Sequence, residues 1–361
     1  SSSRAYGTDR LGALEAGADA YLVKPVDPEE LIQVLEQPMP ARPAASAAPT
    51  RRPIANEPAP APSSDQSVRV KFWGVRGSLP TPGYETAFFG GNTSCVSVRA
   101  NGEIIVLDAG TGIRALGKEL VAEFKDQPIN LTLLISHTHW DHIQGFPFFI
   151  PAYNPRNRLR ILGYEGSRKG LEATLASQME SPYFPIGLRE LPGHIVIQEV
   201  KELQFSIGKV GVNAWFLNHP GICMGYRLAT PAGTIVYAPD NEPSERFRLH
   251  AGAAAAKGPE AAAFARAEDA KMVEFIRGAD VLIIDAQYDA GDYEQRAGWG
   301  HGCLDDVVAL ALEAQVKRLF LFHHDPDYDD GRIQRRVAHA RELAAQRGSG
   351  MLVEAAREGL E

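Results

Sequence analysis

The sequence has little cysteine and no long apolar run. Its three cysteines, Cys95, Cys223 and Cys303, are odd in number and far apart, which argues against a disulfide framework and a cysteine-based zinc knuckle. We expect reduced thiols that serve as small core residues. The apolar stretches are short ones such as Val281–Ile284, well below the roughly 18 residues that a membrane-spanning helix needs. The first residues show no basic-then-apolar signal pattern, so we expect a soluble, cytoplasmic protein.

The chain also lacks an excess of positive charge. Its 361 residues include 37 Lys and Arg against 45 Asp and Glu, a net charge of −8. No overall positive field therefore draws it to nucleic acid or to an anionic membrane. A local basic groove stays open, because a basic stretch runs from Arg156 to Lys169. With 44 % hydrophobic and 23 % charged residues, the composition is typical of one large or two ordinary globular domains, and it excludes collagen, coiled coil and wholesale disorder.

A proline- and alanine-rich linker, residues 38–66, separates a short leading segment from the rest of the chain. Residues 38–62 hold eight prolines and eight alanines, a composition that cannot bury a core and favours extended conformations. In the leading segment, residues 1–37, the pattern predicts a strand over Ala20–Val23 and a helix that begins after Asp27-Pro28. A piece of this size is too small to fold alone, so we expect it to be incomplete or to borrow packing from elsewhere.

Residues 16–25, which end in Lys24-Pro25, resemble the last strand and helix of a bacterial response-regulator receiver domain. The resemblance implies that the phosphoacceptor aspartate lies upstream, in a longer parent protein, and that a receiver or phosphorelay partner controls this chain. An ordinary α/β segment is the alternative interpretation.

The remaining chain, residues 67–361, combines strand patterns with helical ones. Strands are predicted over residues 68–73, 95–98, 104–107, 131–136, 159–162, 211–216, 225–228, 234–237, 281–284 and 319–322. Helices are predicted over residues 113–124, 272–276 and 304–314, with an alanine-rich surface helical insertion over residues 251–267. Strands crowd together in the first half and alternate with helices in the second. We therefore expect an α/β fold in which outer helices cover two sheets, an αββα sandwich.

Three histidines fall within the six residues 137–142, directly after an apolar run. Where a strand leads into a loop, residues i and i+2 point the same way, so His137 and His139 can share one ion. Asp141 and His142 can open a helix and face a second ion beside it. Imidazole nitrogen and carboxylate oxygen suit a borderline divalent metal. A solvated histidine-rich turn and histidines that cap a helix are the competing interpretations.

Further ligands are expected at the ends of later strands, because two ions need about four positions each. His219, Asp240 and His323 each follow an apolar run. A carboxylate can bridge two metals with its two oxygens, which makes Asp240 the natural bridge. Taken singly, each of the three could be only a polar residue that ends a strand. His324 stands beside His323, and we choose His323 because it continues the strand.

Seven positions of this sequence resemble the metal-binding pattern of the metallo-β-lactamase superfamily. They are His137, His139, Asp141, His142, His219, Asp240 and His323, and the resemblance covers about residues 68–357. It implies a metallo-β-lactamase-like αββα sandwich with two metal sites. One site would take His137, His139, His219 and Asp240, and the other Asp141, His142, Asp240 and His323. Cysteine is absent from these positions, which departs from the lactamase branch, so antibiotic hydrolysis is not expected.

Two further residues resemble the phosphodiesterase branch that includes ribonuclease Z. Asp285 ends the apolar run 282–285, and His301 lies in a glycine-rich loop, residues 298–302. The resemblance makes His301 a proton donor or phosphate contact oriented by Asp285, and these two residues with Asp141 form the expected catalytic set. A carboxylate on one ring nitrogen fixes the tautomer that such an acid needs. As ordinary structure, Asp285 would cap a loop and His301 would be a turn residue.

Other residues near these motifs have less defined roles. The resemblance places Arg76 and Asn92 at the border of the cleft, where they would either touch substrate or serve as plain turns. Asp108 follows a strand and would either accept the free N–H of a ligating histidine or stabilise a turn. A lid is expected around Tyr183-Phe184, whose rings would either stack on a base or pack the lid onto the domain.

These features together predict a hydrolase that needs two divalent metal ions. Two ions about 3.5–4 Å apart lower the pKa of a bridging water toward about 7 and neutralise charge on a phosphoryl oxygen. The expected reaction is cleavage of a small phosphodiester, such as a cyclic nucleotide, by a metal-bridging hydroxide. Zinc is the expected metal, and manganese and iron suit the same ligands.

Two other functions stay open at this point. One is a ribonuclease Z-like RNA endonuclease, although a long nucleic acid is the less expected substrate of this acidic chain. The other is a non-catalytic output module of a signalling protein, in which the metals only stabilise the fold. No membrane partner is expected, and a homodimer is left open.

Overall fold

The structure is a computed structural model that describes residues 67–164, 170–250 and 258–361. The predicted receiver-like segment, residues 1–37, and the predicted linker, residues 38–66, lie outside the described residues, so both stay predictions. None of the described helices is long and apolar enough to cross a membrane.

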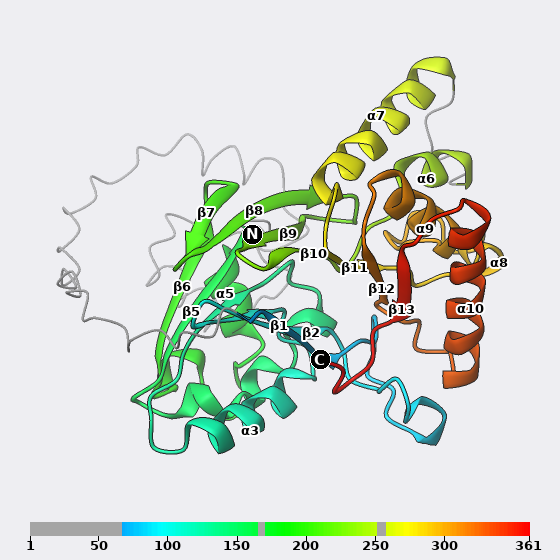
Figure 1. Ribbon diagram of the computed structural model, residues 1–361. Coiled ribbons are helices and arrows are strands. Elements are labelled where there is room, and N and C mark those ends of the chain that lie inside the picture. Colours follow the sequence, from blue (N-terminus) through cyan, green and yellow to red (C-terminus); the bar gives the residue numbers. More distant parts are fainter. Residues whose placement is uncertain (1–66, 165–169, 251–257) are drawn as a thin grey trace, which may run out of the picture. The chain divides into compact units, whose positions relative to one another are not determined.

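Two sheets, one of six strands and one of seven, form the described fold (Figure 1). The first has the order β1-β2-β3-β4-β5-β6 and the second the order β13-β12-β11-β10-β9-β8-β7. The strands of the first sheet are β1 (Arg69–Gly74), β2 (Cys95–Ala100), β3 (Glu103–Leu107), β4 (Asn130–Leu134), β5 (Arg158–Tyr164) and β6 (His194–Val200). Those of the second are β7 (Gln204–Ile207), β8 (Val210–Leu217), β9 (Cys223–Thr230), β10 (Gly233–Ala238), β11 (Val281–Asp285), β12 (Arg318–Phe322) and β13 (Leu352–Ala355).

Helices pack on the outer face of each sheet (Figure 1). The first sheet carries α3 (Ile113–Phe124) and α5 (Gly170–Ser177), and the second carries α7 (Pro259–Ile276), α9 (Leu304–Glu313) and α10 (Asp330–Gln346). Shorter helices are α4 (Trp140–Ile143), α6 (Ser244–His250) and α8 (Ala290–Tyr293), with 3₁₀ turns η1 (Tyr84–Thr86), η2 (Phe146–Phe148), η3 (Ile150–Tyr153) and η4 (Leu188–Glu190). The layers are those of the αββα sandwich that the sequence predicts.

The core between the sheets is built from both of them. Val98 and Ile105 of the first sheet share one buried cluster with Tyr226 and Phe320 of the second. Residues that point the other way from the same strands form two further clusters against the helices, because successive strand residues face opposite sides. Burial on both faces accounts for the continuous apolar runs of the central strands.

Parallel pairing brings the carboxyl ends of neighbouring strands to one edge. In the first sheet β3 runs parallel to β4, with Leu107 opposite Leu134. In the second sheet β10, β11 and β12 are parallel, and Asp285 lies opposite Phe322. The residues that follow these strands therefore leave their sheets at the same edge, which is where ligands bind in parallel α/β sheets.

All ten predicted strands occur within a few residues of their predicted bounds. The sequence does not predict β6, β7, β13, α5, α6, α8 or α10. Strand β6 lies at the edge of the first sheet, and all its residues before Val200 are exposed or half-buried. Helix α10 packs with few large apolar residues, such as Ile333 and Val337. The predicted surface insertion over residues 251–267 lies in part outside the described residues. Its remainder belongs to α7, whose last turns are buried on the second sheet through Val273 and Ile276.

Candidate metal centre

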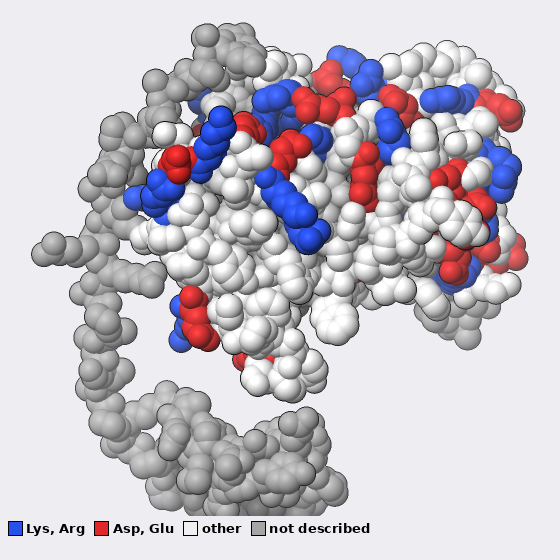
Figure 2. All heavy atoms as spheres, turned by 90° about the horizontal axis from the view of Figure 1, so that it is seen from below, with Lys and Arg blue, Asp and Glu red and all other residues white. Residues whose placement is uncertain are grey.

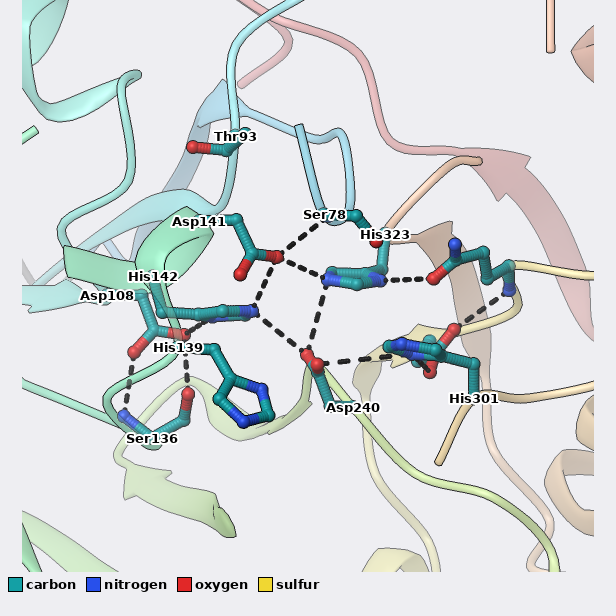
Figure 3. A network of polar contacts seen from close by, with 12 residues as sticks. Ser78, Thr93, Asp108, Ser136, His139, Asp141, His142, Asp240, His301 and His323 are labelled. Carbon is teal, nitrogen blue, oxygen red and sulfur yellow. Dashed lines mark hydrogen bonds and ion pairs between the residues drawn. The ribbon is translucent and has the colours of Figure 1, made fainter. Parts of the chain in front are cut away.

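Histidine and aspartate side chains that lie far apart in the sequence converge at the strand ends. Figure 3 shows His139, Asp141, His142, Asp240 and His323 among them. Two of them leave the end of β4, two lie in α4, and one each follows β8, β10 and β12. In that order they are His137 and His139, Asp141 and His142, His219, Asp240 and His323. All the residues that the sequence marks as candidate ligands are thus brought together.

These side chains fall into two groups, in each of which the donor atoms lie within 4.8 Å of one another. One group holds His137, His139, His219 and Asp240. The other holds Asp141, His142 and His323. The first group is the first set that the family resemblance implies, and the second group is the second set without Asp240.

Asp240 lies between the two groups. Its Oδ2 is 3.6 Å from Nε2 of His137 and 3.6 Å from Nε2 of His219. Its Oδ1 is 3.1 Å from Nε2 of His142 and 3.4 Å from Nε2 of His323. The two oxygens of one carboxylate therefore face different groups, which is the geometry that a bridging ligand needs.

Three buried polar atoms of this cluster lack a well-directed hydrogen bond among the described residues, although two of them form an ion-pair contact of 3.1 Å with each other. They are Nε2 of His137, Nε2 of His142 and Oδ1 of Asp240. A buried polar atom left without a partner costs about 1–3 kcal/mol, so three of them in one cluster indicate a place for cations. Imidazole and carboxylate donors suit zinc, manganese and iron alike. The residues present fit a dimetal site and leave the identity of the metal open.

Burial sets the protonation of the first group. It lowers the pKa of His137, His139 and His219 below the ordinary value, and for His137 well below it. Because burial disfavours the charged form, these rings are neutral, which is the form that binds a metal.

In the second group and at Asp240, carboxylates and imidazoles shift one another's pKa values. Burial acts to raise the pKa of Asp240, but the imidazoles of His323 and His142 outweigh it and hold that pKa well below its ordinary value. Burial likewise acts to lower the pKa of His323, yet Asp240 and Asp141 raise it to about 9. The carboxylates around these imidazoles carry the charge that a divalent cation would neutralise.

Asp108 fixes the orientation of His142. Its Oδ2 lies 2.7 Å from Nδ1 of His142 and accepts the hydroxyl of Tyr237 at 2.8 Å. The backbone N–H and the hydroxyl of Ser136 each donate to the same carboxylate at 2.7 Å. Asp108 has a φ of 60°, a left-handed conformation that a non-glycine residue seldom adopts and that concentrates at functional sites. Of the two roles expected for Asp108, the structure shows the contact with a candidate ligand.

Close packing holds two other donor rings. Nδ1 of His323 is 2.9 Å from Oε1 of Gln287, and a Cβ on Gly77 would lie 2.3 Å from the same nitrogen. Nδ1 of His219 is 2.9 Å from the carbonyl oxygen of Gly300, which has a φ of +88° and a Cβ position 2.3 Å from that ring. Only glycine fits at either place.

The expected catalytic pair lies beside these donors. Nδ1 of His301 is 2.9 Å from Oδ2 of Asp285, and the ring of His301 stacks on His323 with centroids 4.9 Å apart. Asp285 is fully buried. Its carboxylate also accepts the backbone N–H groups of Asn241, Gln287 and Gly302. Because a carboxylate only accepts, Nδ1 of His301 must carry a proton, and Nε2 is the nitrogen left for chemistry. His301 also forms a third donor group with Asp240 and His323.

Arg76 requires a correction. It is fully buried, so it has no surface to offer a substrate. Its guanidinium donates to the backbone carbonyls of Gly90, Asp325 and Tyr328 at 2.8, 3.1 and 2.6 Å. Arg76 therefore ties the loop after β1 to the segment after β12. Asn92 is partly exposed, and its side-chain amide donates to Glu358 at 2.9 Å, so its substrate contact stays a prediction.

The structure also shows where the cysteines, His324 and the Tyr183-Phe184 segment lie. The three cysteines are free and buried, as expected. His324 is buried, with Nε2 3.0 Å from the carbonyl oxygen of Ala356. Tyr183 is 84 % exposed, and Phe184 packs edge-on against Phe148. The role of this segment as a lid stays a prediction.

Sequence reasoning missed Glu242. This residue is buried, and its carboxylate accepts the backbone N–H groups of Gly298 and Gly300 at 2.8 and 3.0 Å together with the hydroxyl of Tyr293. Glu242 thereby anchors the loop that carries His301. The available signal was an acidic residue two positions after Asp240, at the same strand end.

Known proteins share this fold. A model of the β-lactamase superfamily domain matches residues 103–262. The described residues have the metallo-β-lactamase fold. Ribonuclease Z of Thermoplasma acidophilum is 25 % identical to it over 295 residues, which are 73 % of this chain and 88 % of that protein.

Two solved structures extend the likeness in fold over most of the chain. The metallo-β-lactamase fold protein YhfI from Bacillus subtilis has a TM-score of 0.55 and 18 % identity, and the match covers 81 % of this chain and 97 % of that one. A diphosphatase of the PhnP family has a TM-score of 0.53 and 17 % identity, with 81 % and 96 % covered. The predicted fold is confirmed. The hydrolase relatives and the two donor groups together point to a metal-dependent hydrolase.

Proposed function

We propose that this metallo-β-lactamase domain is a dimetal phosphodiesterase that cleaves a small or cyclic nucleotide. The observation that carries the proposal is the pair His301–Asp285, which lies directly beside two donor groups joined by Asp240. An acid held in a fixed orientation is useful where the leaving oxygen is a poor anion, as in a phosphodiester of an alcohol.

His301, Asp285 and Asp141 would have different roles in the reaction. Bound divalent ions would lower the pKa of water and neutralise charge on a phosphoryl oxygen. His301 would give the proton on Nε2 to the leaving oxygen, while Asp285 holds the ring and stabilises its charged form. Asp141 would serve the second group, where its Oδ2 accepts the backbone N–H of Ser78 at 2.8 Å.

The space beside the donors supports a small substrate. A cavity of about 110 Å³ adjoins His137 and His139 and is lined further by Tyr164, Leu171 and Ile222 among the described residues. A cavity of this size suits a phosphodiester group held beside the donors.

An RNA endonuclease is the second candidate, because the curated relative is named ribonuclease Z. Charge argues against it. On the face in Figure 2, lysines and arginines are interleaved with aspartates and glutamates, and described pairs such as Lys71–Glu119 and Arg99–Glu123 neutralise one another. RNA binding through many phosphates would weaken steeply with added salt, so a salt titration that shows a shallow slope or no binding excludes this candidate.

A substrate screen tests the proposal directly. Protein of known metal content is assayed with cyclic nucleotides, dinucleotides, short RNAs and bis(p-nitrophenyl) phosphate, and Asp240→Ala serves as the matched variant without a bridge. We expect hydrolysis of at least one small diester by the wild type and none by the variant. If the protein holds two metals and cleaves no diester, the non-catalytic output module is the correct function.

Two finer expectations complete the proposal. We propose zinc as the metal, which elemental analysis of protein purified without added metal checks. We also propose that a receiver domain of a longer parent regulates hydrolysis, as the resemblance of residues 16–25 implies. A phosphodonor should then change the turnover of the longer protein and leave that of residues 67–361 unchanged.

A further inference from the structure

Two tryptophans are strongly exposed next to the donor residues. Trp140 is 75 % exposed and stands between His139 and Asp141. Trp299 is 59 % exposed and stands two residues before His301. Tryptophan is among the residues that bury most of their surface in folded proteins. Two exposed indoles beside one buried polar site therefore indicate a surface that binds something.

His219 connects the two segments that carry these indoles. Its Nε2 is 3.0 Å from Nδ1 of His139, the residue before Trp140. Its Nδ1 is 2.9 Å from the carbonyl oxygen of Gly300, the residue after Trp299. The imidazole of His219 thus contacts the sequence neighbour of Trp140 through one ring nitrogen and the sequence neighbour of Trp299 through the other.

The backbone beneath both indoles is fixed by hydrogen bonds. The N–H of Trp299 donates to the carbonyl of Arg296 at 3.0 Å, and the N–H groups of its two glycine neighbours donate to Glu242. Trp140 begins α4, and its carbonyl accepts the N–H of Gln144 at 2.7 Å. A ligand that stacks on them meets a platform whose backbone is already ordered, which lowers the entropic cost of binding.

We propose that Trp140 and Trp299 form a stacking subsite for the nucleobase of the substrate, an inference that rests on the phosphodiesterase function proposed above. Every base has a flat π face that stacks on aromatic side chains, and stacking needs no positive surface, in keeping with the net charge of −8. Trp299 and His301 belong to one anchored loop, so the same segment would hold the base and protonate the leaving oxygen. A diester without an aromatic group would meet only the donors and His301.

Two cyclic diesters that differ in the base test this subsite. The holoenzyme and its variants are assayed with 2′,3′-cyclic AMP and with glycerol 1,2-cyclic phosphate. Trp140→Leu and Trp299→Leu should each raise KM for the nucleotide by about 5- to 100-fold, change the glycerol ester by less than about twofold, and keep the metal content. Phenylalanine at either position should restore most of the nucleotide's KM. Phe264→Leu is the matched control, since Phe264 is 67 % exposed on α7, outside the donor groups.

Several outcomes would overturn the subsite. Equal losses on the two esters, or no loss on the nucleotide, would do so. If the wild type cleaves neither of these esters, binding decides the subsite separately, and the phosphodiesterase function fails only if no diester of the screen is cleaved. AMP should then quench tryptophan fluorescence with a Kd at least about fivefold below that of ribose 5-phosphate, and the difference should vanish in the double leucine variant. Equal affinities for AMP and ribose 5-phosphate would assign the indoles to another role. The same holds if the wild type is a dimer and the double leucine variant is a monomer that still prefers AMP.

Discussion

Replacing His301 with alanine removes the proposed proton donor with little other damage. The ring makes one hydrogen bond to Asp285 and stacks on His323, and it belongs to neither of the two main donor groups. In the variant, Asp285 keeps three backbone N–H donors, so the buried carboxylate remains satisfied. We therefore expect His301→Ala to fold and to retain two metals.

The size of the kinetic loss follows from the role of the ring. Loss of a general acid costs about 10²–10⁴-fold in rate, or about 2.7–5.4 kcal/mol of barrier. The loss should depend on the leaving group, because a proton matters only where the leaving oxygen is a poor anion. A nucleoside leaving group should show this full loss. Bis(p-nitrophenyl) phosphate, whose p-nitrophenolate leaves without a proton, should lose about tenfold or less.

The assay pairs initial rates on both diesters with elemental analysis of each preparation. His339→Ala is the matched control, because His339 lies half-exposed on α10 and contacts Asp305 at 2.8 Å. Equal losses on the two diesters would refute proton donation and leave His301 as a phosphate contact. Loss of one metal would make His301 a ligand beside Asp240 and His323.

Four further changes probe the surrounding residues. Asp141→Ala should lower the metal content from two ions to one per chain, because it removes a donor of the second group; an unchanged content in elemental analysis would remove Asp141 from the ligands. Asp108→Asn should weaken metal binding by about 10- to 100-fold in a chelator titration, since the charge that orients His142 is lost, and unaltered affinity would assign Asp108 to the turn alone. Glu242→Gln should lower kcat more than it raises KM at constant metal content, because one amide of the catalytic loop loses its acceptor; a fall in metal content instead would contradict this. Arg76→Leu should lower Tm, because buried carbonyls that lose their donor cost about 1–3 kcal/mol each, whereas a raised KM at unchanged Tm would restore its role in substrate binding.

The strand ends explain why most of the site was predictable. His219, Asp240 and His323 each follow a buried apolar strand. Strands β10 and β12 run parallel within the second sheet, and β8 runs in the same direction because both β8 and β10 are antiparallel to β9, so all three residues leave at one edge. The same argument places Asp108 and the histidines after β4. Local pattern and topology together therefore predict the cluster without any knowledge of distances.

The residues that escaped prediction make contacts across long sequence separations. Arg76 donates to carbonyls 249 and 252 positions away, so its sequence neighbourhood shows only a turn and not its burial. The side chain of Gln287 contacts His323, and that of Glu242 accepts an N–H of the loop before His301. Neither residue belongs to a motif or a spacing that the local sequence would reveal. Helix α10 packs through small residues such as Ala340 and Ala344, which weakens the periodic signal on which helix prediction depends.

Anomalous diffraction from metal-loaded crystals tests the central claim most directly. The account predicts two peaks about 3.5–4 Å apart, one beside each oxygen of Asp240, with His219 at the first and His323 at the second. A single peak, or two peaks that do not share Asp240, would contradict it.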